Sequence, residues 1–172
     1  RPRPRVLGIS GPQGSGKSTL ARALVARFAE RGQRVAEVSI DDFYLRREEQ
    51  VALAAAHPGS RVLEVRGYPG THDVALGART LDALGALGRG QRLALVRYDK
   101  SAHGGLGDRA PEAAWAEVEG PLDGVVLEGW MLGFTPVVPE ALEDGELLVA
   151  NEALAAYASW HERLDALVVL EA

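Results

Sequence analysis

Eight residues near the start of the chain have the types and spacing of a phosphate-binding loop: Gly11-Pro12-Gln13-Gly14-Ser15-Gly16-Lys17-Ser18. Two glycines bracket four residues, and a lysine and a serine follow, as in phosphate-loop proteins. Glycine lets backbone N–H groups approach phosphate oxygens that a Cβ atom would obstruct. In this pattern the lysine lies between the β- and γ-phosphates, and the serine hydroxyl is a Mg²⁺ ligand. The motif predicts a nucleoside triphosphate site; a chance match to a glycine-rich turn is the alternative.

The segments on both sides of the loop favour the nucleotide site. Residues 6–9 are a short apolar run of the buried-strand type. After the loop, apolar residues recur at helical spacing to about residue 31, where Gly32 provides a stop. A strand, a loop and a helix in this order place the helix N-terminus, with its dipole, at the phosphates. The residues predicted to bind the nucleotide are Gly11, Pro12, Gln13, Gly14, Ser15, Gly16, Lys17, Ser18 and Thr19.

Four more strands are expected, and two of them end in acids. Residues 34–40 lead into Asp41 and Asp42, and residues 123–130 are apolar until Glu128. Residues 93–96 and 166–170 are the other two candidates. Strands separated by helical stretches predict an α/β protein, here a phosphate-loop fold with a parallel five-stranded sheet and helices on both faces. The acids would then lie at one edge with the loop, where Glu128 could organise Mg²⁺, although a turn or a cap is the commoner use of paired aspartates.

Helices are expected over residues 48–56, 76–87 and 147–164, with a shorter one over 111–118. The buried face of the third helix is expected to comprise Leu148, Leu154, Tyr157 and Trp160. Two loops carry polar side chains, over residues 66–73 and 103–109. The second is so rich in glycine that it is either a mobile lid over a site or a plain flexible loop.

The composition limits the class of protein. A chain of 172 residues with 25% charged and 47% hydrophobic residues is expected to form one domain spanning 1–172. The net charge of −5 argues against a general nucleic-acid binder, and no apolar run has the length of a membrane span. The absence of cysteine fits a cytoplasmic location. The sequence is silent on the oligomeric state.

Five segments keep a common order along the chain. They are Ser39-Ile40-Asp41-Asp42-Phe43-Tyr44-Leu45, Arg66-Gly67 with Gly70-Thr71-His72-Asp73, Arg97-Tyr98-Asp99-Lys100-Ser101, Gly107-Asp108-Arg109-Ala110 and Glu128-Gly129-Trp130-Met131-Leu132-Gly133-Phe134. Together with the phosphate loop they resemble D-glycerate 3-kinase of the plant and fungal type. That family is similar in fold to phosphoribulokinase, uridine kinase and pantothenate kinase, which phosphorylate hydroxyl groups of small metabolites.

The resemblance implies a kinase that uses ATP and Mg²⁺ to phosphorylate D-glycerate to 3-phosphoglycerate. It implies Asp41 as general base, Asp42 as second choice, Lys17 at the phosphates, and Ser18 with Glu128 at the metal. Arg66, Arg97 and Arg109 are candidates for the substrate carboxylate, since a guanidinium binds it through paired bonds. Lys100 could neutralise the moving phosphoryl group. The expected partners of the substrate hydroxyls are His72, Asp73 and Tyr98.

One difference from the family is expected to matter. The family has a helix rich in Arg and Glu after its last strand, which lies over ATP in related kinases, and this chain ends at Ala172 without it. Two alternatives therefore stay open. The acceptor could be another sugar acid, polyol or nucleoside, or the chain could be an ATP-binding module without transfer activity.

Overall fold

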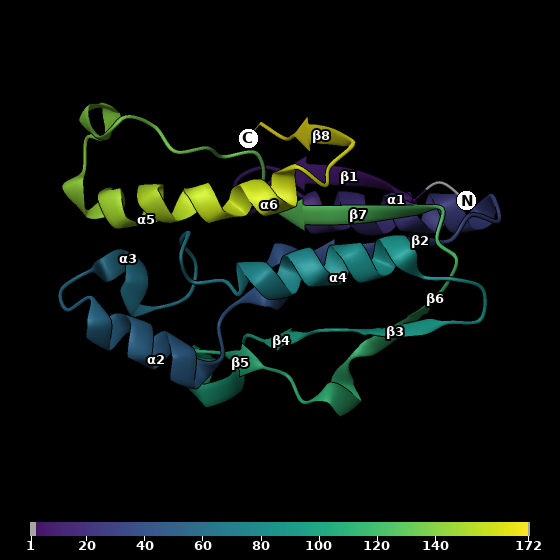
Figure 1. Cartoon of the computed structure of the whole chain (residues 1–172), viewed down its shortest axis with the longest axis horizontal. Coiled ribbons are helices and arrows are strands. Elements are labelled where there is room, and N and C mark those ends of the chain that lie inside the picture. The colour runs from purple at the N-terminus through teal and green to yellow at the C-terminus, as the bar shows by residue number, and fades with distance from the viewer. Residues whose placement is uncertain (1–2, 172) are drawn as a thin grey trace.

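The computed structural model describes residues 3–171, and a parallel sheet of four strands lies at its centre (Figure 1). The strands are β1 (Arg5–Ser10), β2 (Val35–Ser39), β7 (Gly124–Gly129) and β8 (Ala166–Val169), in the spatial order β2-β7-β1-β8. In the register, Gly8 of β1 lies opposite Leu127 of β7 on one side and Leu167 of β8 on the other. The carboxyl ends of all four strands therefore share one edge of the sheet.

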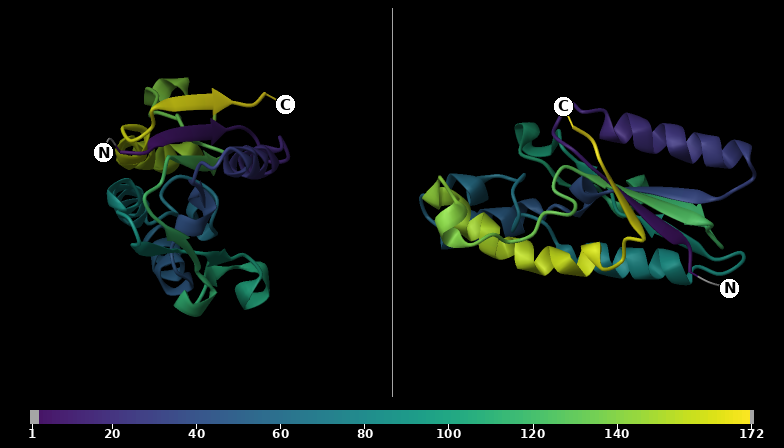
Figure 2. Two further views of the ribbon diagram at one scale, coloured as in Figure 1. Left: turned by 90° about the vertical axis from the view of Figure 1, so that its right-hand side faces the viewer. Right: turned by 90° about the horizontal axis from the view of Figure 1, so that it is seen from above.

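Helices cover both faces of this sheet, as predicted (Figure 2). Helix α1 (Lys17–Glu30) packs on one face, where Ala21 meets Ile9 and Val126 in a small apolar cluster. Helices α4 (Val74–Ala86) and α6 (Ala158–His161) lie on the other face, over the larger core. There Leu84 and Trp160, both almost fully buried, join apolar side chains of β1, β2 and β7. The phosphate loop is thus held between a buried strand and a helix that is packed along its length.

One of the five strands predicted for the parallel sheet does not belong to it. Residues 93–96 contribute to β3 (Arg92–Leu95), which pairs antiparallel with β6 (Ala116–Glu119) in a separate two-stranded sheet. The helix expected over residues 111–118 is also wrong, because only a short 3-10 turn (Glu112–Ala114) precedes β6. Glu117, Val118 and Glu119 alternate polar and apolar side chains, which is the pattern of a half-exposed strand.

The remaining elements extend from the acid-bearing edge of the sheet. Strand β2 runs into the 3-10 turn η1 (Ile40–Phe43), and then come α2 (Arg47–Ala56) and α3 (Arg61–Glu64). Strands β4 (Tyr98–Asp99) and β5 (Asp108–Arg109) form a short antiparallel hairpin. We call residues 100–107, which connect β4 to β5, the hairpin loop.

The long helical stretch predicted over residues 147–164 consists of α5 (Leu148–Ala153), a 3-10 turn η6 (Leu154–Tyr157) and α6. Leu154, Tyr157 and Trp160 are buried as predicted, but Leu148 is 38% exposed and does not belong to that face. Within residues 3–171 there is no helix with the length and apolar character needed to cross a membrane.

Candidate active site

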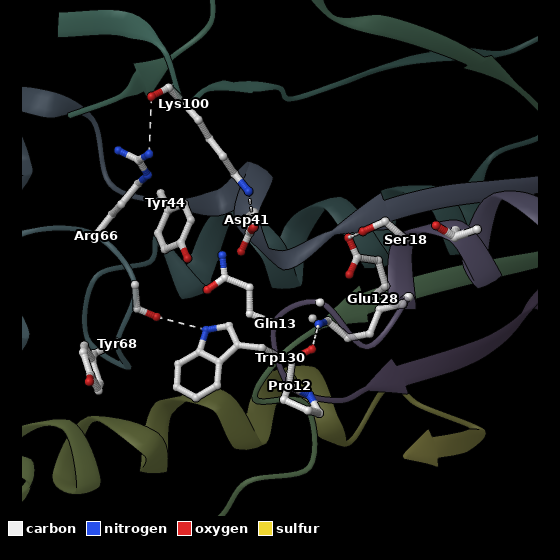
Figure 3. A pocket seen from close by; sticks show the side chains of 16 residues that line it. Pro12, Gln13, Ser18, Asp41, Tyr44, Arg66, Tyr68, Lys100, Glu128 and Trp130 are labelled. Carbon is white, nitrogen blue, oxygen red and sulfur yellow. Dashed lines mark hydrogen bonds and ion pairs between the residues drawn. The ribbon is translucent and has the colours of Figure 1, made fainter. Parts of the chain in front are cut away.

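A cavity of about 840 Å³ opens at the carboxyl edge of the sheet, between the phosphate loop and the segments that follow β2 and β7 (Figure 3). Residues 66–68 and Lys100 complete its wall. The lining residues are Pro12, Gln13, Gly14, Gly16, Lys17, Ser18, Thr19, Asp41, Tyr44, Arg66, Gly67, Tyr68, Lys100, Glu128, Gly129 and Trp130. The structure therefore brings together the phosphate loop, the first aspartate and the strand-end glutamate.

The phosphate loop has the conformation that its glycines allow. Gly14 and Gly16 both have left-handed backbone angles, with φ of 83° and 86°, and Gly16 is the residue before α1. The Lys17 ammonium group donates to the carbonyl oxygen of Pro12 at 2.8 Å, so it folds back over the loop. Because the first N–H groups of α1 have no partner within the helix, they and the helix dipole favour an anion here.

Ser18 and Glu128 form an oxygen pair suited to Mg²⁺. The Ser18 hydroxyl donates to Glu128 Oε1 at 3.2 Å, and Glu128 is only 6% exposed although it is charged. Within residues 3–171, no three His, Cys, Asp or Glu side chains lie together as a ready-made metal site. Mg²⁺ in phosphate-transfer proteins is usually held by one or two protein oxygens plus phosphates and water. The donor set therefore fits a metal that arrives with a nucleotide.

The two adjacent aspartates point to different places. Asp41 lines the cavity, and its carboxylate accepts from Lys100 Nζ at 2.6 Å. Burial, together with the charge and hydrogen bond of Asp41, raises the pKa of Tyr44, so the phenol stays protonated beside this carboxylate. Asp41 is thus placed as a hydrogen-bond acceptor in the cavity that the phosphate loop also lines.

Asp42, the second choice for general base, lies outside the cavity lining. Its carboxylate accepts from Arg97 Nη1 at 2.6 Å and from the Tyr98 backbone N–H at 3.1 Å. Burial raises the pKa of Asp42, and Arg97 only partly offsets the effect. The same ion pair occupies Arg97, one of the candidates for a substrate carboxylate. Asp42 and Arg97 thus join η1 to the start of β4.

Of the seven residues expected to contact the acceptor or the moving phosphoryl group, only Arg66 and Lys100 line the cavity. Asp73 caps α4 by accepting from the Leu76 N–H at 2.8 Å, and it pairs with Arg109 at 3.4 Å. Tyr98 packs with its edge against Tyr44, with ring centroids 5.4 Å apart. Asp73, Arg109 and Tyr98 therefore lie outside the cavity lining, although Tyr98 packs against Tyr44, which belongs to it.

His72 is buried beneath the cavity wall. Its ring stacks on Tyr44 at 4.2 Å between centroids, and its Nδ1 lies 2.8 Å from the Tyr157 hydroxyl. The Tyr157 oxygen also accepts from the Gly70 N–H, so this hydroxyl joins His72 to the loop before α4. Burial lowers the pKa of His72 to about 3, so the ring is neutral. It is placed to hold Tyr44, out of reach of the cavity.

The prediction of the site from the sequence did not include an aromatic wall. Tyr44, Tyr68 and Trp130 all line the cavity, and the Tyr68 and Trp130 rings meet edge to face at 6.2 Å. The Trp130 indole N–H donates to the carbonyl of Gly67 at 3.1 Å and so joins the loop after β7 to the loop before α4. Position in the sequence could have indicated two of these rings, since Trp130 follows a strand-end acid by two residues and Tyr44 follows the paired aspartates.

A phosphate loop after β1, an acid at the end of the adjacent strand β7, and a second acid after β2 that faces the loop together define a phosphate-loop kinase fold. The chain is 45% identical to the chloroplastic D-glycerate 3-kinase of Arabidopsis thaliana over 98% of its own length. It is 36% identical to a probable ATP-dependent kinase of Saccharomyces cerevisiae over 86% of its length. The resemblance to D-glycerate 3-kinase predicted from the sequence is confirmed.

A solved structure agrees with these similarities. The D-glycerate 3-kinase of Cryptococcus neoformans superposes with a TM-score of 0.87 at 34% identity, over 97% of this chain and 63% of that one. The chain spans 38% of the Arabidopsis protein and 52% of the yeast protein. Residues 2–47 also match the family model of the methylmalonyl-CoA mutase-associated GTPase MeaB. That match covers β1, the phosphate loop, α1 and β2, which phosphate-loop proteins of different activities share.

Proposed function

We propose that this chain carries the nucleotide and acceptor sites of an ATP-dependent kinase that phosphorylates D-glycerate to 3-phosphoglycerate. The observation that best supports this proposal is that Asp41 faces the phosphate loop across one cavity, with Lys100 Nζ 2.6 Å from its Oδ2 atom. The similarity to D-glycerate 3-kinase, which runs along almost the whole chain, supports this choice of acceptor. A cytoplasmic location stays a prediction from the sequence.

The residues of the cavity have distinct roles in this proposal. Asp41 accepts the proton of the acceptor hydroxyl as that oxygen bonds to the γ-phosphorus, while the bond from the γ-phosphorus to the bridging oxygen breaks and ADP leaves. Lys17 releases the Pro12 carbonyl and binds the β- and γ-phosphates. Ser18 and Glu128 hold Mg²⁺, which supplies positive charge to the phosphate oxygens when bound.

The acceptor's own carboxylate requires a cation. Among the described residues, the cations that line the cavity are Lys17, Arg66 and Lys100. Lys17 belongs to the phosphates, and backbone carbonyls occupy much of Arg66. Lys100, whose side chain is 58% exposed, is therefore the group that we assign to the incoming anion.

A coupled assay of ADP release tests the proposal. ADP should form only when D-glycerate is present, and Asp41→Ala and Lys17→Ala should each abolish it. Asp82→Ala is the matched control, because Asp82 lies on α4 and pairs with Arg163 at the surface. ADP release that is the same with and without D-glycerate would contradict the assignment of the acceptor.

The aromatic wall favours a second candidate, a kinase of the same fold acting on a larger hydroxylated acceptor. The cavity of about 840 Å³ and the rings of Tyr68 and Trp130 offer apolar surface that glycerate alone would not cover. A panel of sugar acids, polyols and nucleosides, each with ATP or GTP, separates the two candidates. Nucleotide binding without transfer to any acceptor would instead indicate a binding module.

A further inference from the structure

Arg66, from another part of the chain, binds the backbone of the hairpin loop. Arg66 donates through Nη1 to the carbonyl of Gly105 at 2.9 Å and to that of Leu106, and through Nη2 to the carbonyl of Lys100 at 3.3 Å. Its guanidinium also lies over the Tyr98 ring, 5.6 Å from the centroid. Three of its five N–H donors are thus used by the loop backbone, and one face is covered by an aromatic ring.

The glycines of the loop make this arrangement possible. His103, Gly104, Gly105 and Gly107 all have left-handed φ angles, between 53° and 97°. A Cβ atom on Gly107 would come within 2.5 Å of the Tyr98 ring and 2.7 Å of Arg66 Nη1. The loop is therefore coiled around the guanidinium of Arg66.

The same loop carries the cation of the active site. Arg66 holds the backbone carbonyl of Lys100, while the side chain of that lysine reaches Asp41 at 2.6 Å (Figure 3). Fixing the backbone limits the directions in which a long, half-exposed lysine can extend. Hydrogen bonds inside the loop, from the Gly105 N–H to the carbonyl of Ser101 and from the Gly107 N–H to that of Ala102, shape the coil, and Arg66 binds this coil from the cavity wall.

The geometry points to Arg66 as a positioning residue that latches the hairpin loop and so places Lys100 on Asp41, in place of the substrate-carboxylate role expected from the sequence. The catalytic part of this inference rests on the proposed function. The latch itself does not, because it is a property of the chain without substrate.

Amide hydrogen exchange of the 172-residue chain tests the latch. Arg66→Lys keeps the charge but loses the fork, and the amides of residues 101–107 should exchange about tenfold faster or more. Arg61→Lys is the matched control, because Arg61 pairs with Glu146 at the surface. Unchanged exchange in the hairpin loop of Arg66→Lys overturns the inference.

Gly107→Ala perturbs the same latch from the loop side and guards against a folding defect of the Arg66 variant. Gly104→Ala is its control, since Gly104 lies in the same loop with a left-handed φ of 68° and a Cβ atom there would meet nothing within 4 Å. Faster exchange of residues 101–107 in Gly107→Ala alone supports the latch. Equal exchange in the two glycine variants shows backbone strain only and counts against it.

A double-mutant cycle tests the link to Lys100. Arg66→Lys should lower kcat/KM for D-glycerate about tenfold in the wild-type background and have almost no further effect when Lys100→Ala is present. If Arg66 binds the acceptor directly, its effect persists in the Lys100→Ala background and the two effects multiply, which overturns the positioning role. If wild-type protein transfers no phosphate to D-glycerate, the proposed function fails, while the exchange experiment still decides the latch.

Discussion

Replacing Asp42 with alanine should mainly lower the stability of the fold, whereas replacing Asp41 with alanine should mainly abolish phosphate transfer. Asp42 is 14% exposed at its side chain and receives hydrogen bonds from Arg97 and the Tyr98 backbone. Deleting one partner of a buried pair costs roughly 3–5 kcal/mol, because the other partner is left unpaired. Arg97 is 35% exposed, so water can hydrogen-bond its guanidinium once the carboxylate is gone, which reduces this cost. We therefore expect Asp42→Ala to lower the free energy of unfolding by about 2–3 kcal/mol. For a domain of this size that lowers Tm by roughly 4–12 °C.

Asp41→Ala should behave in the opposite manner. Asp41 pairs with Lys100, which is largely exposed, and is hydrogen-bonded to Tyr44, so Asp41→Ala should cost about 1–2 kcal/mol, less than Asp42→Ala. Phosphate transfer should nevertheless be abolished. Urea unfolding and ADP release, measured on both variants, separate an aspartate that supports the structure from one that acts in the chemistry.

The pH dependence of stability provides a sharper test of Asp42. Because burial raises its pKa in the folded state, the folded protein binds this proton more readily than the unfolded chain does. The contribution of Asp42 to stability is therefore greatest at low pH and falls as the pH rises from the ordinary pKa of aspartate through the raised one. Asp42→Asn should lose this decline and, because its one amide oxygen can still accept from either Arg97 or the Tyr98 N–H, cost less than Asp42→Ala. An Asp42→Asn protein with wild-type stability but no transfer activity would refute the reasoning and give Asp42 a chemical role.

Three other predictions concern the core and the metal. Burial lowers the pKa of His72 to about 3, so the folded protein keeps this ring neutral while the unfolded chain binds a proton. The free energy of unfolding should therefore fall by about 2 kcal/mol between pH 6.5 and pH 5. Urea unfolding of His72→Phe should not show this loss. Gly77→Ala should destabilise by about 1–3 kcal/mol, since its Cβ would lie 2.6 Å from the Trp160 ring. Gly85→Ala in the same helix meets nothing within 4 Å and should stabilise by about 0.5–1 kcal/mol, so equal thermal shifts would contradict the packing argument. Glu128→Gln should raise the Mg²⁺ concentration needed for half-maximal transfer about tenfold or more, and an unchanged requirement would remove Glu128 from the metal site.

The parts of the fold that local patterns specify could be predicted from the sequence. The strand, phosphate loop and helix are contiguous and each has its own signal, so they agree with the structure to within a residue or two. The sheet count failed at Leu93, because an apolar run indicates a strand but does not indicate which strand it will pair with. That partner depended on residues 116–119, where the proline and alanines just upstream gave a competing helical signal.

The candidate site shows a similar limit. The sequence placed Asp41 and Asp42 together at a strand end, but it could not separate their roles. In the 3-10 turn η1 successive residues point about 120° apart, so one carboxylate faces the cavity and the other faces the hairpin. His72 and Arg109 belong to motifs that resemble an active site, yet their burial against Tyr157 and Asp73 follows from long-range packing that no local pattern records.

The place of β1 in the sheet has a consequence for how the chain is made. β1 emerges from the ribosome before both of its neighbours, β7 and β8, which lie much later in the chain. Helix α1 can shield one face of the new strand through Leu20 and Val25, but both edges keep unpaired backbone groups until β7 and β8 have emerged. During that interval β1 is open to pairing with other nascent chains, so slower expression at lower temperature should raise the yield of soluble protein.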